Sequence, residues 1–169
     1  MDGAILLWIQ DNIRQETVTP WVLLYTSLGS FGAVWAVGAA VLAVVPRTRQ
    51  MGWLALLSLL FSGLVGEVIK FIVRRPRPFL QIEDLTALGS LPHSFSFPSG
   101  HTVCAFAVAF IIWRMCRGWQ RWLVMILAAL MAFSRLYLGV HYPSDVLAGV
   151  VVAFVGSCFV WRYRSKIGL

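Results

Sequence analysis

Long apolar segments alternate with short polar or basic turns along this chain of 169 residues. Five of the segments come close to the roughly 20 apolar residues that a helix needs to cross a bilayer. They cover residues 21–45, 51–73, 99–115, 122–138 and 143–161. An open sheet in lipid would leave backbone groups without hydrogen-bond partners, whereas a helix pairs them internally. The pattern therefore predicts an all-α fold, a polytopic transmembrane helical bundle of about five spans.

Two further segments complete the predicted organisation. Residues 5–13 are too short to span a membrane and include Asp11 and Asn12, which favours a short interfacial helix at the N-terminus. Residues 74–98 form the longest polar stretch, and the prolines within it exclude one continuous helix. No internal repeat divides the chain, so we expect residues 1–169 to form a single domain.

Composition favours a membrane protein over a soluble one. Hydrophobic residues make up 59% of the chain and charged residues 12%, too few to cover the surface of a soluble domain. The formal net charge is +7, but the basic residues gather between apolar segments. That placement favours contact with membrane lipids over a nucleic-acid partner. No feature of the sequence indicates an oligomeric state.

The three cysteines do not suggest chemistry. Cys104, Cys116 and Cys158 all lie in apolar segments. Their spacing fits neither a zinc site nor a redox pair. We expect buried, inert thiols.

The basic residues also predict an orientation. Consecutive spans run in opposite directions, so alternate turns face opposite sides of the membrane. One side carries eight of the 14 Lys and Arg residues, namely Arg47, Arg49, Arg114, Arg117, Arg121, Arg162, Arg164 and Lys166. The other side carries the remaining six, namely Arg14, Lys70, Arg74, Arg75, Arg77 and Arg135. Cytoplasmic loops hold the excess of basic residues. We therefore expect residues 74–98 outside and the C-terminus in the cytoplasm.

Three polar segments converge on the predicted outer side. In the first, residues 70–78, Lys70, Arg74 and Arg77 recur at helical spacing. One face would present three cations if the helix continued that far. The alternative is that these side chains snorkel to the lipid headgroups. Glu67 lies nearly on the same face, and we expect it to tether Lys70 or Arg74 or to face a wet cavity, with no catalytic role.

The second polar segment, residues 96–101, stands immediately before the third span. Pro98 and Ser99 suit a helix start, and Gly100 allows the backbone to approach a ligand closely. The free N–H groups and the dipole of a helix N-terminus form an anion site, here with His101 beside it. The alternative is an ordinary serine cap followed by a chance histidine.

The third polar segment, residues 134–145, joins the last two spans. Arg135 ends one span, and His141 precedes the next. Asp145 is four residues after His141, within reach if the helix has begun. A carboxylate bound to one imidazole nitrogen fixes the tautomer and leaves the other nitrogen free for attack. A structural His–Asp pair is the alternative, although ionisable residues at membrane depth are usually functional.

Together the three segments indicate phosphoryl transfer, which depends on positioning and on stabilising charge over the phosphoryl oxygens. The set comprises the cations Lys70, Arg77 and Arg135, the small donors Ser99 and Gly100, and the proton-transfer residues His101, His141 and Asp145. The carboxylates available to these segments are few, and no His-x-x-x-His spacing appears in the chain. We therefore expect neither a metal nor another cofactor.

These residues resemble the type 2 phosphatidic acid phosphatase (PAP2) family. The family pattern is K-x6-R-P, then P-S-G-H, then S-R-x5-H-x3-D. The chain matches every defined position, with Lys70, Arg77, Pro78, Pro98, Ser99, Gly100, His101, Ser134, Arg135, His141 and Asp145. The overall look is closest to small bacterial members, which include undecaprenyl-diphosphate phosphatases. Many membrane members have six spans, so five spans and a short helix are a departure.

The resemblance implies a role for each residue. His141 would be the nucleophile that forms a phosphohistidine, Asp145 would orient it, and His101 would protonate the leaving oxygen. The residues that would hold the phosphoryl oxygens are Lys70, Arg77, Ser99, Gly100 and Arg135.

The expected function is a metal-independent hydrolase of a lipid phosphate or diphosphate at the outer face of a bacterial-type plasma membrane. The family resemblance alone implies undecaprenyl diphosphate as the first substrate. Phosphatidylglycerol phosphate, phosphatidic acid and diacylglycerol pyrophosphate stay open. One alternative is a phosphotransferase that passes the phosphoryl group from His141 to an acceptor other than water. Another is a transporter or structural bundle, although no chain of ionisable residues crosses the middle of the membrane. The resemblance also admits vanadate-dependent haloperoxidases, but these are soluble.

Overall fold

The helices follow the apolar segments closely. The computed structural model describes residues 1–167, which form seven α-helices, three 3-10 turns and no strand. The α-helices are α1 (Asp2–Asn12), α2 (Thr19–Leu28), α3 (Ala33–Val44), α4 (Arg49–Val73), α5 (Gly100–Met115), α6 (Gln120–Tyr137) and α7 (Pro143–Tyr163). The 3-10 turns are η1 (Ser30–Gly32), η2 (Pro78–Leu80) and η3 (Arg164–Ile167). The all-α prediction is confirmed. The single domain stays a prediction, and residues 168 and 169 lie outside the described part of the chain.

The first predicted span is a broken helix rather than a continuous one. Residues 21–45 divide into α2 and α3, which are bent by 52° relative to each other. Gly32 ends the intervening turn with a φ of 73°, a left-handed conformation that costs glycine little because it has no Cβ. A Cβ at Gly32 would also lie 2.9 Å from the Sγ atom of Cys104 on α5. The break therefore brings the backbone of η1 close against α5.

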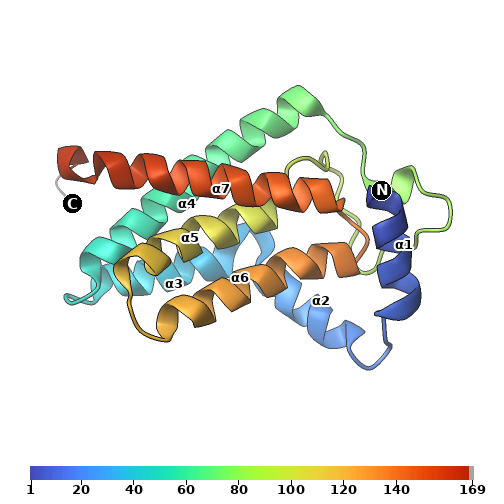
Figure 1. The fold of residues 1–169 in the computed structure, drawn as a ribbon, viewed down its shortest axis with the longest axis horizontal. Helices are drawn as coiled ribbons and strands as arrows, with labels where there is room; N and C mark the ends of the chain where they lie inside the picture. The colour runs from blue at the N-terminus through green and yellow to red at the C-terminus, as the bar shows by residue number, and fades with distance from the viewer. Residues whose placement is uncertain (168–169) are drawn as a thin grey trace.

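Helix α5 lies at the centre of the bundle. It packs against α4, α6 and α7, and Figure 1 shows it between α6 and α7. Ala105, Ala107 and Ala109 are completely buried, and small side chains of this kind let helices approach closely in membrane bundles. Leu54 of α4 and Met131 of α6 are buried in the same core. This packing fixes the position at which α5 begins.

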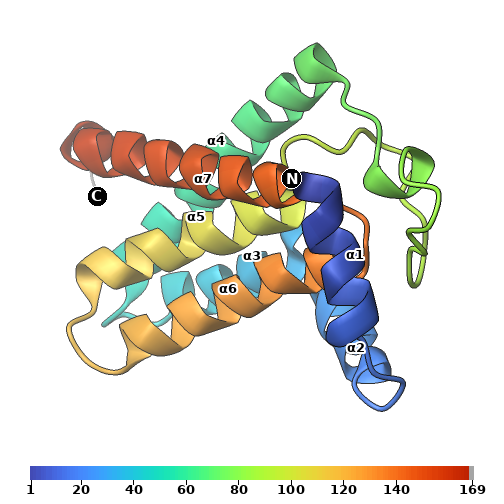
Figure 2. The same ribbon diagram turned by 45° about the vertical axis from the view of Figure 1, so that its right-hand side comes forward.

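The N-terminal helix and the long loop cover one end of the bundle. Figures 1 and 2 both place α1 and the loop between α4 and α5 at the end opposite the C-terminus. Leu6 of α1 packs with Leu85 of the loop and with Tyr142. The guanidinium of Arg14 donates hydrogen bonds to the carbonyl oxygens of Tyr137 and Thr86, at 2.8 and 2.6 Å. The predicted short helix is present, and its place in the membrane interface stays a prediction.

Length and composition identify spans among the described residues. Two helical stretches, Arg49–Leu80 and Pro143–Lys166, are long and apolar enough to cross a membrane. The bent pair α2 and α3 makes a third if it counts as one span, and α5 is apolar but has only 16 residues. The polytopic helical bundle is thus supported, and the count of five spans stays a prediction.

Candidate active site

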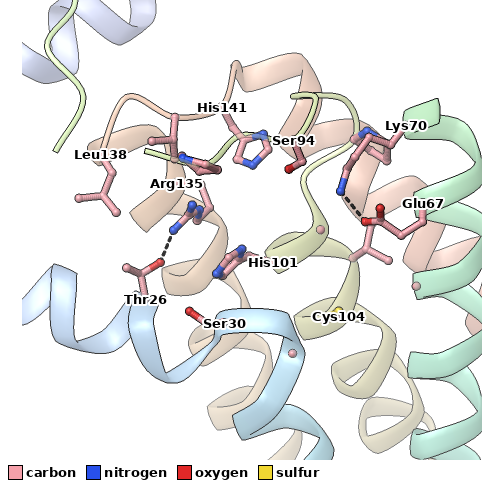
Figure 3. A pocket seen from close by; sticks show the side chains of 18 of the residues that line it. Thr26, Ser30, Glu67, Lys70, Ser94, His101, Cys104, Arg135, Leu138 and His141 are labelled. Carbon is pink, nitrogen blue, oxygen red and sulfur yellow. Dashed lines mark hydrogen bonds and ion pairs between the residues drawn. The ribbon is translucent and has the colours of Figure 1, made fainter. Parts of the chain in front are cut away.

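One large cavity opens at the covered end of the bundle. Its volume is about 880 Å³, and residues of α2, η1, α4, α5, the long loop and the α6–α7 turn line it. Figure 3 shows His101 and His141 projecting into this space, with Arg135 on one side and Lys70 on the other. The lining also includes Arg77 and Gly100. Six of the eight predicted site residues therefore meet in one cavity.

Lys70 reaches the cavity because α4 ends soon after it. The last residue of α4 is Val73, and Arg74 takes a left-handed conformation with a φ of 49°. Arg74 is exposed and its Nε donates to the carbonyl oxygen of Phe71, at 3.0 Å. Lys70 is only 8% exposed. The predicted face of three cations is therefore wrong for Arg74, because the helix does not continue past residue 73.

Arg77 enters the site from the loop that follows α4. Its Nε donates to the Ser94 carbonyl oxygen at 2.7 Å, and its Nη1 donates to the Val140 carbonyl oxygen at 2.8 Å. Nη1 also lies 3.3 Å from Nε2 of His141. Burial lowers the pKa of Arg77 to about 10, and the negative charge of Asp145 opposes this change. The guanidinium thus stays charged at neutral pH, and its hydrogen bonds connect the long loop to the turn between α6 and α7.

Arg135 lies in the last turn of α6. It is 6% exposed, and its Nη1 donates to the hydroxyl of Thr26 on α2 at 2.5 Å. Its Nε is buried and has no hydrogen-bond partner among the described residues. A buried donor without a partner is costly, so this atom is a candidate ligand contact.

The start of α5 faces the same space. Ser99 precedes the first helical residue, Gly100, and both Gly100 and His101 line the cavity. The N–H groups of a first helical turn have no partner within the helix. The Nε2 atom of His101 is also buried and finds no hydrogen-bond partner within residues 1–167. Ser99 is different, because its completely buried hydroxyl accepts a hydrogen bond from Thr102 at 2.9 Å and does not line the cavity.

His141 and Asp145 form a buried pair where α7 begins. Nδ1 of His141 lies 3.5 Å from Oδ2 of Asp145. The same oxygen accepts hydrogen bonds from the backbone N–H of Tyr142 at 2.9 Å and from the Ser96 hydroxyl at 2.5 Å. Asp145 therefore caps the helix that carries it. With Nδ1 directed at the carboxylate, Nε2 of His141 is the nitrogen directed at Arg77.

Burial keeps the imidazole of His141 neutral. It lowers the pKa of His141 to about 4, the hydrogen bond to Asp145 opposes this, and the charges of Arg77 and Arg135 add to it. A neutral imidazole with its Nδ1 hydrogen bonded to a carboxylate keeps a lone pair on Nε2. That is the form in which a histidine acts as a nucleophile.

Positive charge exceeds negative charge around the cavity. Glu67 is the one carboxylate among its described lining residues, and its Oε1 lies 2.5 Å from Nζ of Lys70. Neither Arg77 nor Arg135 makes an ion pair with a carboxylate within residues 1–167. Buried charges are normally paired. The cavity therefore suits an anionic ligand. Glu67 tethers Lys70, which was one of the alternatives expected for it from the sequence.

The donor set does not resemble a metal site. Within the described residues no three His, Cys, Asp or Glu side chains gather closely enough to hold a metal ion. Cationic side chains supply most of the charge at the cavity. The residues present therefore fit a phosphate better than a metal.

Several contributing residues were missed from the sequence. Thr26 binds Arg135, and Ser94 binds Arg77. Ser96 and Arg75 both bind Asp145. The hydroxyls gave no signal, because single Ser and Thr residues are common in spans and loops. Arg75 was predicted only as one of a run of basic residues.

Comparisons with known proteins identify relatives of this chain. A family profile described as PAP2 superfamily matches residues 51–168. An undecaprenyl-diphosphatase from Sulfolobus acidocaldarius is 34% identical over 138 residues, which cover 82% of this chain and 67% of that protein. The chain spans 67%, 59% and 54% of the length of the first three curated relatives that it matches.

Two crystal structures share the fold. LpxE from Aquifex aeolicus has a TM-score of 0.85 and 25% identity, over 96% of this chain and 95% of the other. A transmembrane PAP2 type phosphatidylglycerolphosphate phosphatase from Bacillus subtilis has a TM-score of 0.76 and 29% identity, over 98% and 85% of the two chains. Since the family profile covers the cavity-lining segments from α4 to α7 and the span candidates are present, the chain is an integral membrane protein that belongs to the PAP2 superfamily.

Proposed function

We propose that this protein is a metal-independent lipid phosphatase that hydrolyses a polyprenyl diphosphate, with undecaprenyl diphosphate as the first candidate. One observation carries the proposal. Two buried arginines, Arg77 and Arg135, pair with no carboxylate in the part of the chain that the structure describes, and they face a cavity that also holds two histidines. A phosphoryl group supplies the negative charge that these arginines lack. The role of each residue is carried over from its match to the family pattern.

The first step forms a phosphohistidine. Nε2 of His141 attacks phosphorus, a P–N bond forms, and the bond between phosphorus and the leaving oxygen breaks. His101 gives its proton to that oxygen. Arg77, Arg135 and Lys70 stabilise the charge on the phosphoryl oxygens, which is usually the largest catalytic contribution.

The second step restores the enzyme. His101, now without its proton, accepts one from a water molecule as that water attacks phosphorus. The P–N bond breaks, inorganic phosphate leaves, and His141 is free again. Asp145 holds Nδ1 of His141 throughout, so that the imidazolium formed in the first step is stabilised.

The apolar part of the cavity supports a lipid substrate. Leucines of α2 and α4 line it, namely Leu23, Leu59, Leu60 and Leu64. Leu60 and Leu64 are 58% and 60% exposed on the outer face of α4. An acyl or prenyl chain that enters from the membrane would contact these side chains while its phosphate reaches the arginines.

The likeness to a phosphatidylglycerolphosphate phosphatase, at 29% identity, favours a glycerophospholipid monophosphate as the second candidate substrate. Phosphatidic acid belongs to the same class. A phosphotransferase would share the first step and differ only in the acceptor, so product analysis with and without an acceptor lipid separates the two.

A panel assay tests the proposal. The purified protein in detergent, with EDTA present, receives undecaprenyl diphosphate, phosphatidylglycerol phosphate and phosphatidic acid, and released phosphate is measured. We expect turnover with chelator and complete loss of turnover and of covalent phosphate in His141→Ala. Activity that disappears in EDTA and returns with Mg²⁺ alone would exclude the metal-free mechanism.

We also propose that the site faces the outside of the plasma membrane. The support is the excess of basic residues on the opposite side of the bundle, with the cations at the cavity set aside for chemistry. A cysteine introduced at Ser90 in the long loop should react with an impermeant reagent on intact cells. Labelling only after lysis would reverse the orientation.

A further inference from the structure

The two oxygens of the Asp145 carboxylate have different partners. Oδ2 faces Nδ1 of His141 and accepts hydrogen bonds from Tyr142 and Ser96. Oδ1 accepts one hydrogen bond, from Nη1 of Arg75 at 2.8 Å. Asp145 is completely buried, and removing one partner of a buried charge is strongly destabilising. Arg75 is thus the cation that compensates Asp145 on the side away from His141.

Arg75 is itself held on several sides. Nη1 also donates to the Ser144 hydroxyl at 2.7 Å, and Nη2 lies 3.1 Å from Oδ2 of Asp2 on α1. Its guanidinium carbon sits 3.8 Å from the ring centroid of Tyr142. Its backbone oxygen accepts a hydrogen bond from the N–H of Ser96 at 2.9 Å. These contacts connect the N-terminal helix to the start of α7.

The neighbouring arginines are placed differently. Arg74 is exposed, and the one side-chain hydrogen bond that it makes within the described residues is to Phe71 of its own helix. Arg77, by contrast, lines the cavity. Arg75 does not line the cavity. It therefore has no path to the phosphoryl group and acts on the reaction through Asp145.

We propose that Arg75 is a positioning residue for the reaction, which fixes the orientation of Asp145 and thereby of His141, and that Asp2 of α1 anchors Arg75. This rests on the proposed role of His141 as the nucleophile. The N-terminal helix then contributes to catalysis although none of its residues contacts the substrate.

The proposal predicts opposite effects on the pH–rate profile for the two partners. The charged and titratable groups that face the His141–Asp145 pair or Arg75 come from every surrounding element. They are Arg75 and Arg77 of the loop, Asp2 of α1, His101 of α5, Arg135 of α6, and Tyr142 before α7. Removing a cation from this group makes proton uptake by the coupled His141–Asp145 pair easier. Removing an anion makes it harder.

The experiment compares Arg75→Ala, Arg75→Lys and Asp2→Asn with Arg74→Ala as the matched control, on the best substrate of the panel. We expect Arg75→Ala to lower kcat by roughly tenfold to a hundredfold, the scale of a displaced catalytic group, with KM changed much less. Its acid limb should move up by about 1 pH unit. Arg75→Lys should restore the acid limb and part of kcat. Asp2→Asn should move the limb the opposite way, and Arg74→Ala should match the wild type.

A purely structural role for Arg75 would give another pattern. The Ala and Lys variants would then lose thermal stability and kcat without movement of the acid limb, and this result would overturn the proposal. A kcat equal to that of the wild type in Arg75→Ala would also overturn the proposal. If Arg75→Ala does not fold, Asp2→Asn still decides, because an acid limb that does not move in that variant contradicts the coupling.

A titration of ¹⁵N-labelled histidines separates this inference from the proposed function. The Nδ1 and Nε2 signals of His141 report its protonation without any substrate. Substitution of the exposed His93 identifies the signals of that residue and so separates them from those of His141. The His141 midpoint should be higher in Arg75→Ala than in the wild type. If no lipid phosphate is turned over, the proposed function fails while this measurement still tests Arg75. An unchanged midpoint would overturn the inference alone.

Discussion

Replacing Arg135 by methionine should weaken catalysis and strengthen the fold at the same time. The substitution keeps an apolar stem of similar length and removes the guanidinium. In the structure Arg135 is 6% exposed. Its guanidinium binds one hydroxyl, that of Thr26, and pairs with no carboxylate within residues 1–167. Without a bound anion the guanidinium is a buried positive charge with little compensation. A bound phosphoryl group would give it a partner of opposite charge.

Both magnitudes follow from this placement. A hydrogen bond to a charged group contributes about 1.5–3 kcal/mol, so the loss of the arginine should lower kcat/KM by roughly tenfold to a hundredfold. Replacing buried ionic groups by apolar residues of similar volume is often stabilising by about 1–4 kcal/mol. Since Arg135 keeps a hydrogen bond to Thr26, we expect the lower part of that range, as a raised melting temperature in detergent.

Thermal unfolding with and without inorganic phosphate or vanadate gives the measurement. A ligand that binds only the folded state raises the melting temperature, so either anion should stabilise the wild type and have little effect on Arg135→Met. Arg74→Met, at an exposed cation near the same end of the bundle, serves as the control and should change neither property. A variant that melts earlier than the wild type and is still stabilised by phosphate would refute the reasoning, because Arg135 would then be a structural residue.

Three further measurements follow from the site. Because burial lowers the pKa of His141 to about 4, the imidazole is neutral above that pH, and kcat/KM should fall as the pH is lowered through about 4; a fall already centred near 6.5 would contradict a buried nucleophile. His101→Ala should lower turnover of a lipid phosphate by about 10²–10⁴-fold and affect a nitrophenyl phosphate less, because that leaving group needs little protonation; equal losses would remove the acid role. Gly149→Ala would place a Cβ 2.9 Å from that of Thr102, so it should cost about 1–3 kcal/mol by overpacking and lower kcat by shifting the start of α5. Gly38→Ala, with open space around it, is the control, and equal melting temperatures of the two would show that the contact relaxes freely.

The sequence predicted the helices well because charges, prolines and glycines interrupt its apolar runs. The second, third, fourth and fifth predicted spans correspond to α4, α5, α6 and α7 with ends that differ by at most a few residues. The break at η1 was not predicted. Glycines in an apolar run are equally typical of close helix packing, and only the positive φ at Gly32 distinguishes the two.

The site was predicted less evenly. Spacing placed Asp145 near His141 correctly, since four residues span one turn once the helix starts at Pro143. The same rule misplaced Arg74, because helix α4 ends between Lys70 and Arg77. Beyond a helix end each residue takes its own direction, so Arg75 was not separable from its neighbours by spacing. Its contacts with Asp2 and Asp145 span 73 and 70 residues of sequence and depend on the tertiary fold.

The ends of four helices explain why the site is tolerated before a phosphate binds. Lys70 and Arg135 lie in the last turns of α4 and α6, and Asp145 lies in the first turn of α7. Each charge thus complements the dipole of its own helix. That contribution is about 0.3–1 kcal/mol for each, and up to about 2 when partly buried, whereas the penalty for a buried ion is several kcal/mol. The dipoles therefore offset only part of the desolvation of the cations, and the remainder is recovered when an anion binds. The N-terminus of α5, with the opposite polarity, adds to the attraction for the same anion. The proposed affinity for phosphate would arise from incomplete compensation within the fold, and for this reason the arginine proposed to bind phosphate is also one whose removal should stabilise the empty protein.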